Sequence, residues 1–229
     1  MGFAKVVKVL LGLYLASSYK SLPGAYFVRF YYYAVSRLVV PMLTGRNTAN
    51  IRKLQANKFG VFAHSKINTY ASPFECDLYL HKNNCTYFTE LDVSRCDLMS
   101  SIFQKLFVDS KRWPFVPVAN VFTNFLKEIK PFESYSITSN VLCWDDKWIY
   151  VISKFKKNNG KVLCSLSLTK YVLKSGRITI PPKEAIEFCG IYNDEVEKIS
   201  QENMKILSEK SGFHETKPLE DLEHLYLSL

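Results

Sequence analysis

Hydrophobic positions recur with a helical period across the middle of the chain. Between Asn84 and Leu106, apolar side chains return at spacings of four and seven residues, which places them on one face of a helix. That face contains Tyr87, Leu91, Leu98, Ile102 and Leu106, and the polar Glu90, Asp97 and Gln104 are available for a more hydrated face. The pattern predicts one long amphipathic helix over Asn84–Leu106.

Segments on both sides of this helix have the composition and the alternation of β-strands. The alternation is clearest after the turn signal Asn158-Asn159-Gly160, where successive side chains from Val162 to Thr169 fall on two faces. The strand candidates are Phe59–Ile67 before the helix and Trp113–Thr123, Glu133–Leu142, Lys147–Phe155 and Val162–Thr169 after it. One strand, a long helix and an antiparallel meander predict an α+β domain in which a curved antiparallel sheet wraps around one central helix.

We expect three segments along the chain. Residues 1–50 are basic and aromatic, residues 58–175 form the α+β domain, and residues 176–229 form a C-terminal tail. Within the tail, Asn193–Glu209 is a helix candidate that is polar on most positions and has few apolar anchors. We expect this helix to pack on the outside of the domain.

The positive charge of the protein is concentrated near its beginning. The 229 residues include 30 Lys or Arg and 21 Asp or Glu, for a net charge of +9. Ten of the basic residues and none of the acidic ones precede Glu75. The rest of the chain has no basic excess to pair with phosphates, so we expect no nucleic-acid partner.

Residues 1–50 have the character of a segment that associates with a membrane. The longest uncharged run, Val9–Tyr19, has eleven residues, whereas a helix needs roughly 20 to cross a bilayer. In Ala25–Leu43 the polar Arg29, Ser36 and Arg37 fall on one side of a helix, as in helices that lie on a membrane. We expect membrane lipid as a partner and a location at the mitochondrion or the endoplasmic reticulum. A mitochondrial targeting segment and a soluble helical extension are the alternatives.

The sequence contains no recognisable metal or cofactor motif. Its six cysteines include no C-x-x-C pair, and its histidines show no metal-ligand spacing. The chain also lacks a G-x-G-x-x-G, a P-loop and a G-x-S-x-G motif. We therefore expect a function that needs no metal and no cofactor.

The segment Glu75–Asp92 carries the candidate chemistry. In it, Asp77 is followed by His81, by the pair Asn83-Asn84 and by Tyr87. This spacing resembles the D-x-N-x-H-x-N-N-x-x-Y signature of hotdog-fold acyl-thioesterases, and it is most similar to the version in the thioesterase superfamily member six proteins. The resemblance covers about residues 58–185 and includes Pro131-Phe132-Glu133, Trp144-Asp145-Asp146 and Pro181-Pro182.

The resemblance implies a fold, an activity and an assembly. In the hotdog fold an antiparallel sheet curls around a long helix, and two subunits pair so that acyl-thioester clefts form at their interface. The implied activity is hydrolysis of a fatty acyl-CoA, or a related acyl thioester, to free fatty acid and CoA. The implied assembly is a homodimer.

The resemblance also assigns roles to individual residues. Thioester cleavage needs a carboxylate that activates water or attacks directly, and dipoles that stabilise the oxyanion. Asp77 matches the catalytic acid of the family, and His81 is expected to orient that carboxylate, to hold the water or to assist the leaving thiolate. Asn83 and Asn84, at a helix N-terminus, cap the helix or polarise the thioester carbonyl. Tyr87 is expected to line the acyl channel.

One position departs from the family pattern. The commonest active pattern has Asn two positions after the acid, and this chain has Tyr79 there. We expect Tyr79 to contact the substrate, although it cannot present a carboxamide. The departure keeps a second hypothesis open, in which a catalytically inactive hotdog protein binds acyl-CoA or lipid. An enoyl-CoA hydratase is less well matched, because His81 follows Asp77 by four positions rather than five and no Pro lies between them.

Overall fold

The protein is built around one antiparallel sheet and one long helix. The computed structural model describes residues 2–109, 113–209, 216–222 and 227–229. The five strands of the main sheet lie in the order β1-β3-β4-β5-β2, and every neighbouring pair is antiparallel. Their bounds are β1 (His64–Tyr70), β2 (Val118–Phe125), β3 (Ser134–Trp144), β4 (Ile149–Lys157) and β5 (Val162–Tyr171).

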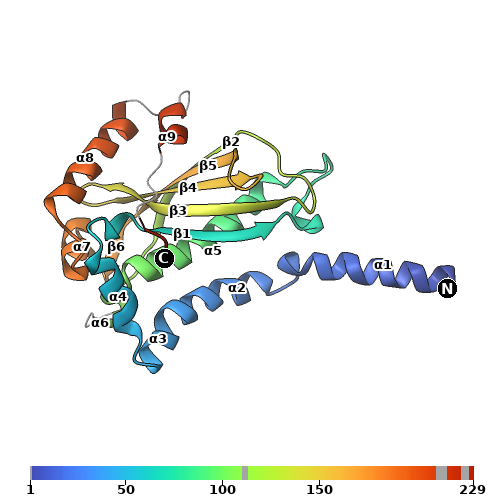
Figure 1. The fold of residues 1–229 in the computed structure, drawn as a ribbon, viewed down its shortest axis with the longest axis horizontal. Coiled ribbons are helices and arrows are strands. Elements are labelled where there is room, and N and C mark those ends of the chain that lie inside the picture. The colour runs from blue at the N-terminus through green and yellow to red at the C-terminus, as the bar shows by residue number, and fades with distance from the viewer. Residues whose placement is uncertain (1, 110–112, 210–215, 223–226) are drawn as a thin grey trace.

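The long helix predicted from the hydrophobic period is confirmed. Helix α5 (Asn84–Ile102) lies against one face of the sheet, and Figure 1 shows it behind the strands. Its Tyr87 and Leu91 pack with Ile137 of β3 and Phe155 of β4. The predicted helix is interrupted near its end, because Phe103 leaves the helical conformation and a short second helix, α6 (Gln104–Asp109), follows. The expected α+β architecture, with an antiparallel sheet packed on a central helix, is therefore present.

The first predicted strand begins later than expected. Residues Gly60–Phe62 form a turn of 3₁₀ helix, and β1 starts only at His64. Gly60 packs directly on helix α4 (Asn47–Ala56), where a Cβ atom would lie 2.2 Å from the carbonyl oxygen of Leu54. This close approach bends the chain and buries Val61 before the strand begins.

The N-terminal segment forms a series of helices. These are α1 (Phe3–Ser17), a 3₁₀ turn (Tyr19–Ser21), α2 (Ala25–Ala34), a π-helical turn (Val35–Val39) and α3 (Val40–Leu43). Helix α1 buries none of its residues and extends away from the body, whereas α2 runs beside α5 (Figure 1). Within the described parts of the chain, no helix combines the length and the apolar character required to span a bilayer.

The polar face of α5 and α6 that was expected to be hydrated is buried. Glu90, Asp97 and Gln104 are each at most 3% exposed. The N-terminal helices cover them and supply their partners: Arg29 pairs with Glu90, and Arg37 pairs with Asp97. These two arginines, which the helical pattern placed on the polar side of a helix lying on a membrane, are therefore paired with carboxylates of α5.

The C-terminal residues close the other end and the outer face of the sheet. They form the hairpin β6 (Leu173–Ser175) and β7 (Ile178–Ile180), then α7 (Pro182–Cys189), α8 (Asp194–Glu209) and α9 (Lys217–Asp221). The predicted tail helix is confirmed as α8, and it packs on β3, where Ser200 Oγ accepts a hydrogen bond from the Trp144 amide. Met204 of α8 packs on the cluster around Leu142.

Candidate active site

The predicted catalytic residues lie on a tight loop that leads into α5. Cys76 and Lys82 face each other in an antiparallel bridge, and the Asp77 amide donates a hydrogen bond of 3.0 Å to the His81 carbonyl. Leu80 has a positive φ of 57°, a conformation that a non-glycine residue adopts only at some cost. The turn brings Asp77 and His81 side by side, as the sequence motif predicts.

The side chains of Asp77 and His81 form a partly exposed pair. The Nδ1 atom of His81 lies 3.6 Å from Oδ1 of Asp77, and both side chains are about a quarter exposed. The same Oδ1 atom accepts a hydrogen bond of 3.0 Å from the Tyr79 amide, which fixes the carboxylate within its loop. The arrangement gives an oriented carboxylate next to an imidazole, the pair that general acid–base chemistry uses.

Asn83 caps helix α5. Its Oδ1 atom accepts a hydrogen bond of 2.9 Å from the Cys85 amide, and its own amide donates one of 2.8 Å to the Glu75 carbonyl. Capping, one of the two roles predicted for this residue, is therefore the one that the geometry shows. Asn84 is exposed at the first position of the helix. The first-turn amides of a helix point outward and carry partial positive charge, so this end favours a developing oxyanion.

A small cavity opens beside this helix end. Its volume is about 140 Å³, and His81, Asn84, Tyr87, Phe125 and Leu126 contribute to its wall. Tyr87 is 2% exposed and packs edge-on against Phe125, and burial raises the pKa of its hydroxyl. Across the described residues, no group of three or more His, Cys, Asp or Glu side chains is arranged to hold a metal ion.

Tyr79 lies on the outside of the loop. Its side chain is 83% exposed, and its ring stacks on the His81 ring with 5.9 Å between centroids. Its neighbours Leu78 and Leu80 are also exposed, so the tip of the loop presents three apolar side chains to the surroundings. Tyr79 thus covers one face of His81 rather than lining the cavity.

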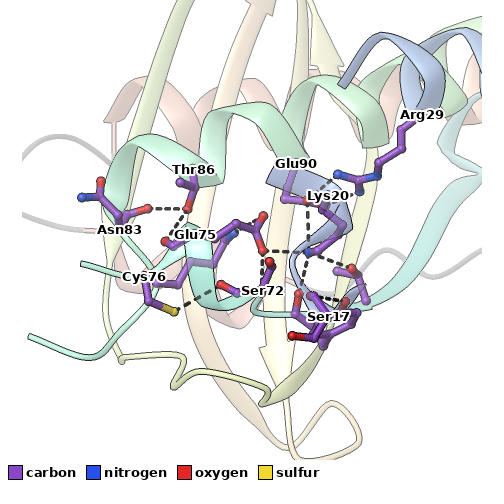
Figure 2. Close-up of polar contacts among 12 residues, drawn as sticks. Ser17, Lys20, Arg29, Ser72, Glu75, Cys76, Asn83, Thr86 and Glu90 are labelled. Carbon is purple, nitrogen blue, oxygen red and sulfur yellow. Dashed lines mark hydrogen bonds and ion pairs between the residues drawn. The ribbon is translucent and has the colours of Figure 1, made fainter. Parts of the chain in front are cut away.

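A buried network of charges lies directly beneath the loop, and the sequence motif did not reveal it. Figure 2 shows Lys20 between the carboxylates of Glu75 and Glu90, with Arg29 on the other side of Glu90. Lys82 completes the network through an ion pair of 3.0 Å with Glu75. Three cations therefore surround two carboxylates in a nearly dry environment.

The network changes the ionisation of its members. Burial alone would raise the pKa of the Glu90 carboxyl, but hydrogen bonds from Arg29 and the charge of Lys20 lower it to about 2. For Lys82, burial lowers the pKa of the ammonium, and the nearby Glu75 opposes the shift. One signal in the sequence points to this network: Glu75 is the first acidic residue after ten basic ones.

Comparisons with known proteins identify the family of this chain. Residues 72–185 match the thioesterase-like superfamily, a range that contains all of the predicted site residues. The chain is 61% identical over 228 residues to a probable thioesterase of Saccharomyces cerevisiae, with 100% of this chain and 99% of that protein covered. It is 30% identical over 208 residues to a thioesterase of Purpureocillium lilacinum, with coverage of 75% and 67%.

A comparison with solved structures finds a similar domain. The crystal structure of a probable thioesterase of Escherichia coli covers 60% of this chain and 98% of its own, with a TM-score of 0.47 and 16% sequence identity.

Proposed function

The chain belongs to the thioesterase-like superfamily, and on that premise we propose that it hydrolyses a fatty acyl-CoA, or a related acyl thioester, to a free fatty acid and CoA. The observation that carries the proposal is the Asp77 carboxylate, held beside His81 at the N-terminal end of α5. The relatives named as thioesterases support the reaction type. The fatty acyl and CoA parts of the substrate are our inference from the sequence motif.

The geometry suits a hydrolysis in which water is the second substrate. Asp77 takes a proton from water as the water oxygen attacks the thioester carbonyl, or it attacks that carbonyl itself and forms an acyl–Asp77 anhydride that water then hydrolyses. Negative charge then develops on the carbonyl oxygen, where the positive end of the α5 dipole stabilises it. The carbon–sulfur bond breaks, and His81 is placed to give the leaving thiolate a proton.

We also propose that the protein acts as a homodimer. Strand β2 pairs with β5 on one side, and its other edge has no strand partner in the described residues. An uncovered edge strand is a template for pairing with another chain. Because Phe125 of β2 lines the small cavity, a second subunit at this edge would complete the walls of the candidate site.

We propose a membrane surface as the place of action. Helix α1 exposes large apolar side chains such as Leu10 and Leu13 and carries Lys5 and Lys8. Its Tyr14 ring contacts Phe74, close to the apolar tip of the catalytic loop. An apolar helix with basic residues binds the interface of anionic membranes. Flotation with vesicles that contain anionic lipid tests this part, and a variant that lacks residues 2–13 should remain unbound.

A non-enzymatic function remains the second candidate. Tyr79 favours this candidate, because the side chain is exposed and presents no carboxamide where active family members have Asn. In this case the protein binds an acyl-CoA or a lipid without turnover.

The test is release of free CoA from acyl-CoA substrates of several chain lengths, measured beside equilibrium binding of the same compounds. We expect the Asp77→Asn variant to retain binding and to lose at least about a hundredfold in rate, as for removal of a general base. Equal rates for wild type and variant would refute the role of Asp77. Binding without turnover in the wild type would favour the second candidate.

A further inference from the structure

A lysine from the N-terminal segment reaches the interior next to the candidate catalytic loop. Lys20 lies in the 3₁₀ turn between α1 and α2, and its side chain is completely buried. Burial of an ammonium group is costly unless it is paired and hydrogen-bonded. Its contacts therefore indicate what the residue does there.

The Lys20 ammonium joins three parts of the protein that surround the loop. It donates hydrogen bonds of 3.1 Å to Thr69 Oγ1 and 2.5 Å to the Tyr70 carbonyl, both at the end of β1. It pairs with Glu75 at 2.9 Å, just before the loop, and with Glu90 at 3.4 Å, in the second turn of α5. Figure 2 shows the contacts with Glu75 and Glu90 meeting at the Lys20 nitrogen.

Glu75 connects Lys20 to the loop through a second ion pair. Its Oε2 atom faces Lys20, and its Oε1 atom lies 3.0 Å from the ammonium of Lys82. Glu75 is two residues before Asp77, and Lys82 directly follows His81. The Glu75–Lys82 pair thus closes the base of the Asp77–His81 turn, and Lys20 holds this pair from the side of the N-terminal segment.

Charge neutralisation does not require Lys20. Without it, Glu75 keeps Lys82 and Glu90 keeps the two hydrogen bonds of 2.7 Å from Arg29. The contribution of Lys20 is therefore geometric: it fixes the carboxylate of Glu75 relative to β1 and α5.

We propose that Lys20 is a positioning residue, which sets the geometry of the Asp77–His81 loop through Glu75 and makes the N-terminal segment part of the catalytic unit. The link to catalysis rests on the proposed function, whereas the link to the loop does not. A displacement of about 1 Å at a reacting group can reduce the rate by about a hundredfold, so a positioning contact of this kind affects turnover.

The chain offers a matched control for this proposal. Arg37 also comes from the N-terminal segment and also pairs with an acidic residue of α5, since its Nε lies 2.6 Å from Asp97 Oδ1. Asp97 lies two turns beyond Glu90 and has no contact with the loop through this pair. Arg37→Met therefore removes a contact between the N-terminal segment and α5 at a distance from Asp77, at a side chain that is 34% exposed.

The experiment compares full-length Lys20→Met with Arg37→Met by hydrogen exchange and by steady-state kinetics. We expect amide exchange at residues 77–83 to increase in Lys20→Met and to stay unchanged in Arg37→Met. We expect kcat of Lys20→Met to fall by about ten- to a hundredfold with KM nearly constant. If Lys20→Met does not fold, Lys20→Gln, which keeps a hydrogen-bond donor, is measured in its place.

Unchanged exchange at residues 77–83 in the Lys20 variant would overturn the proposal, and so would an equal increase in both variants. Increased loop exchange with normal kcat would also overturn it, because Lys20 would then order the loop without affecting the chemistry. If the wild type shows no turnover, the proposed function fails, and the exchange comparison alone still decides whether Lys20 holds the loop.

Discussion

The guanidinium of Arg29 donates two hydrogen bonds of 2.7 Å to the carboxylate of Glu90. The Glu90 side chain is fully buried, and that of Arg29 is 17% exposed. The pair connects helices α2 and α5, and its two residues are 61 positions apart in the sequence. It is one of the ion pairs by which the N-terminal segment is attached to the central helix.

Loss of this contact is expected to destabilise the protein. Arg29→Met removes one partner of a buried ion pair, which costs about 3 kcal/mol of unfolding free energy. Urea denaturation at neutral pH measures the change. Asp221→Asn, which breaks the exposed pair between Lys217 and Asp221, is the control and should change stability by less than about 0.5 kcal/mol. Similar effects of the two substitutions would contradict the importance assigned to Arg29.

The pH dependence of stability should report the ionisation of Glu90. Its pKa is lowered from the ordinary 4.5 to about 2 in the folded state, so folding favours the charged carboxylate. The resulting stability, up to about 3 kcal/mol, is complete above pH 4.5 and is lost as the pH falls toward 2. Denaturation curves between pH 6 and pH 2.5 measure it.

A comparison of two variants separates Glu90 from the other carboxylates. The loss on acidification should be smaller in Glu90→Gln than in wild type. The pKa of Glu133 is also lowered, despite partial burial that would raise it, because the Lys130 amide and the Lys157 ammonium donate hydrogen bonds to its carboxylate. Since this group is much less buried, Glu133→Gln should keep most of the dependence. The same acid sensitivity in Glu90→Gln as in wild type would disprove the assignment.

The cap of α5 should have a measurable effect on stability. Asn83→Ala removes the hydrogen bond that the side chain accepts from the Cys85 amide, at an expected cost of about 1 kcal/mol. Asn83→Asp keeps an acceptor at this position and should restore most of the loss. Thermal unfolding measures both variants, and an Asp variant as unstable as the Ala variant would show that the cap is not the cause.

Two truncations should separate the roles of the N-terminal helices. Removal of residues 2–13 should leave the melting temperature nearly unchanged, because α1 buries none of its residues. Removal of residues 2–45 also deletes Lys20, Arg29 and Arg37 and leaves Glu90 and Asp97 without their cations. Because the deletion removes these ion pairs together with the packing of α2 on α5, this variant should not fold stably. Calorimetry and the yield of soluble protein test both expectations, and a stable second truncation would contradict them.

Local patterns predicted the central part of the fold. The spacing of Tyr87, Leu91 and Leu98 places these side chains on one face of a helix in any context, and the structure confirms it. The strand expected over Phe59–Ile67 was partly wrong, because the contact between Gly60 and the Leu54 carbonyl involves a helix that the pattern did not predict. Close approach of two backbones depends on tertiary packing, which a local pattern does not describe.

The candidate site could be predicted in part for a similar reason. The short spacing from Asp77 to Asn83 restricts these residues to one loop, so their proximity follows from the sequence. The partners of Glu75 and Glu90 could not be identified in this way. Arg29 lies on the polar side of its helix whether its partner is a lipid phosphate or a buried carboxylate. Only the fold shows that the partner is Glu90.

The sequence separation of the pair formed by Arg29 and Glu90 has a consequence for synthesis on the ribosome. Arg29 is made 61 residues before its partner, which at about 5–20 residues per second corresponds to a delay of about 3–12 s. Lys20 is made 70 residues before Glu90, so its interval is slightly longer. During this interval the nascent N-terminal segment is cationic and apolar and has not yet met the acidic groups that later bury it. The N-terminal segment can therefore dock through these two cations only after Glu90 has been made.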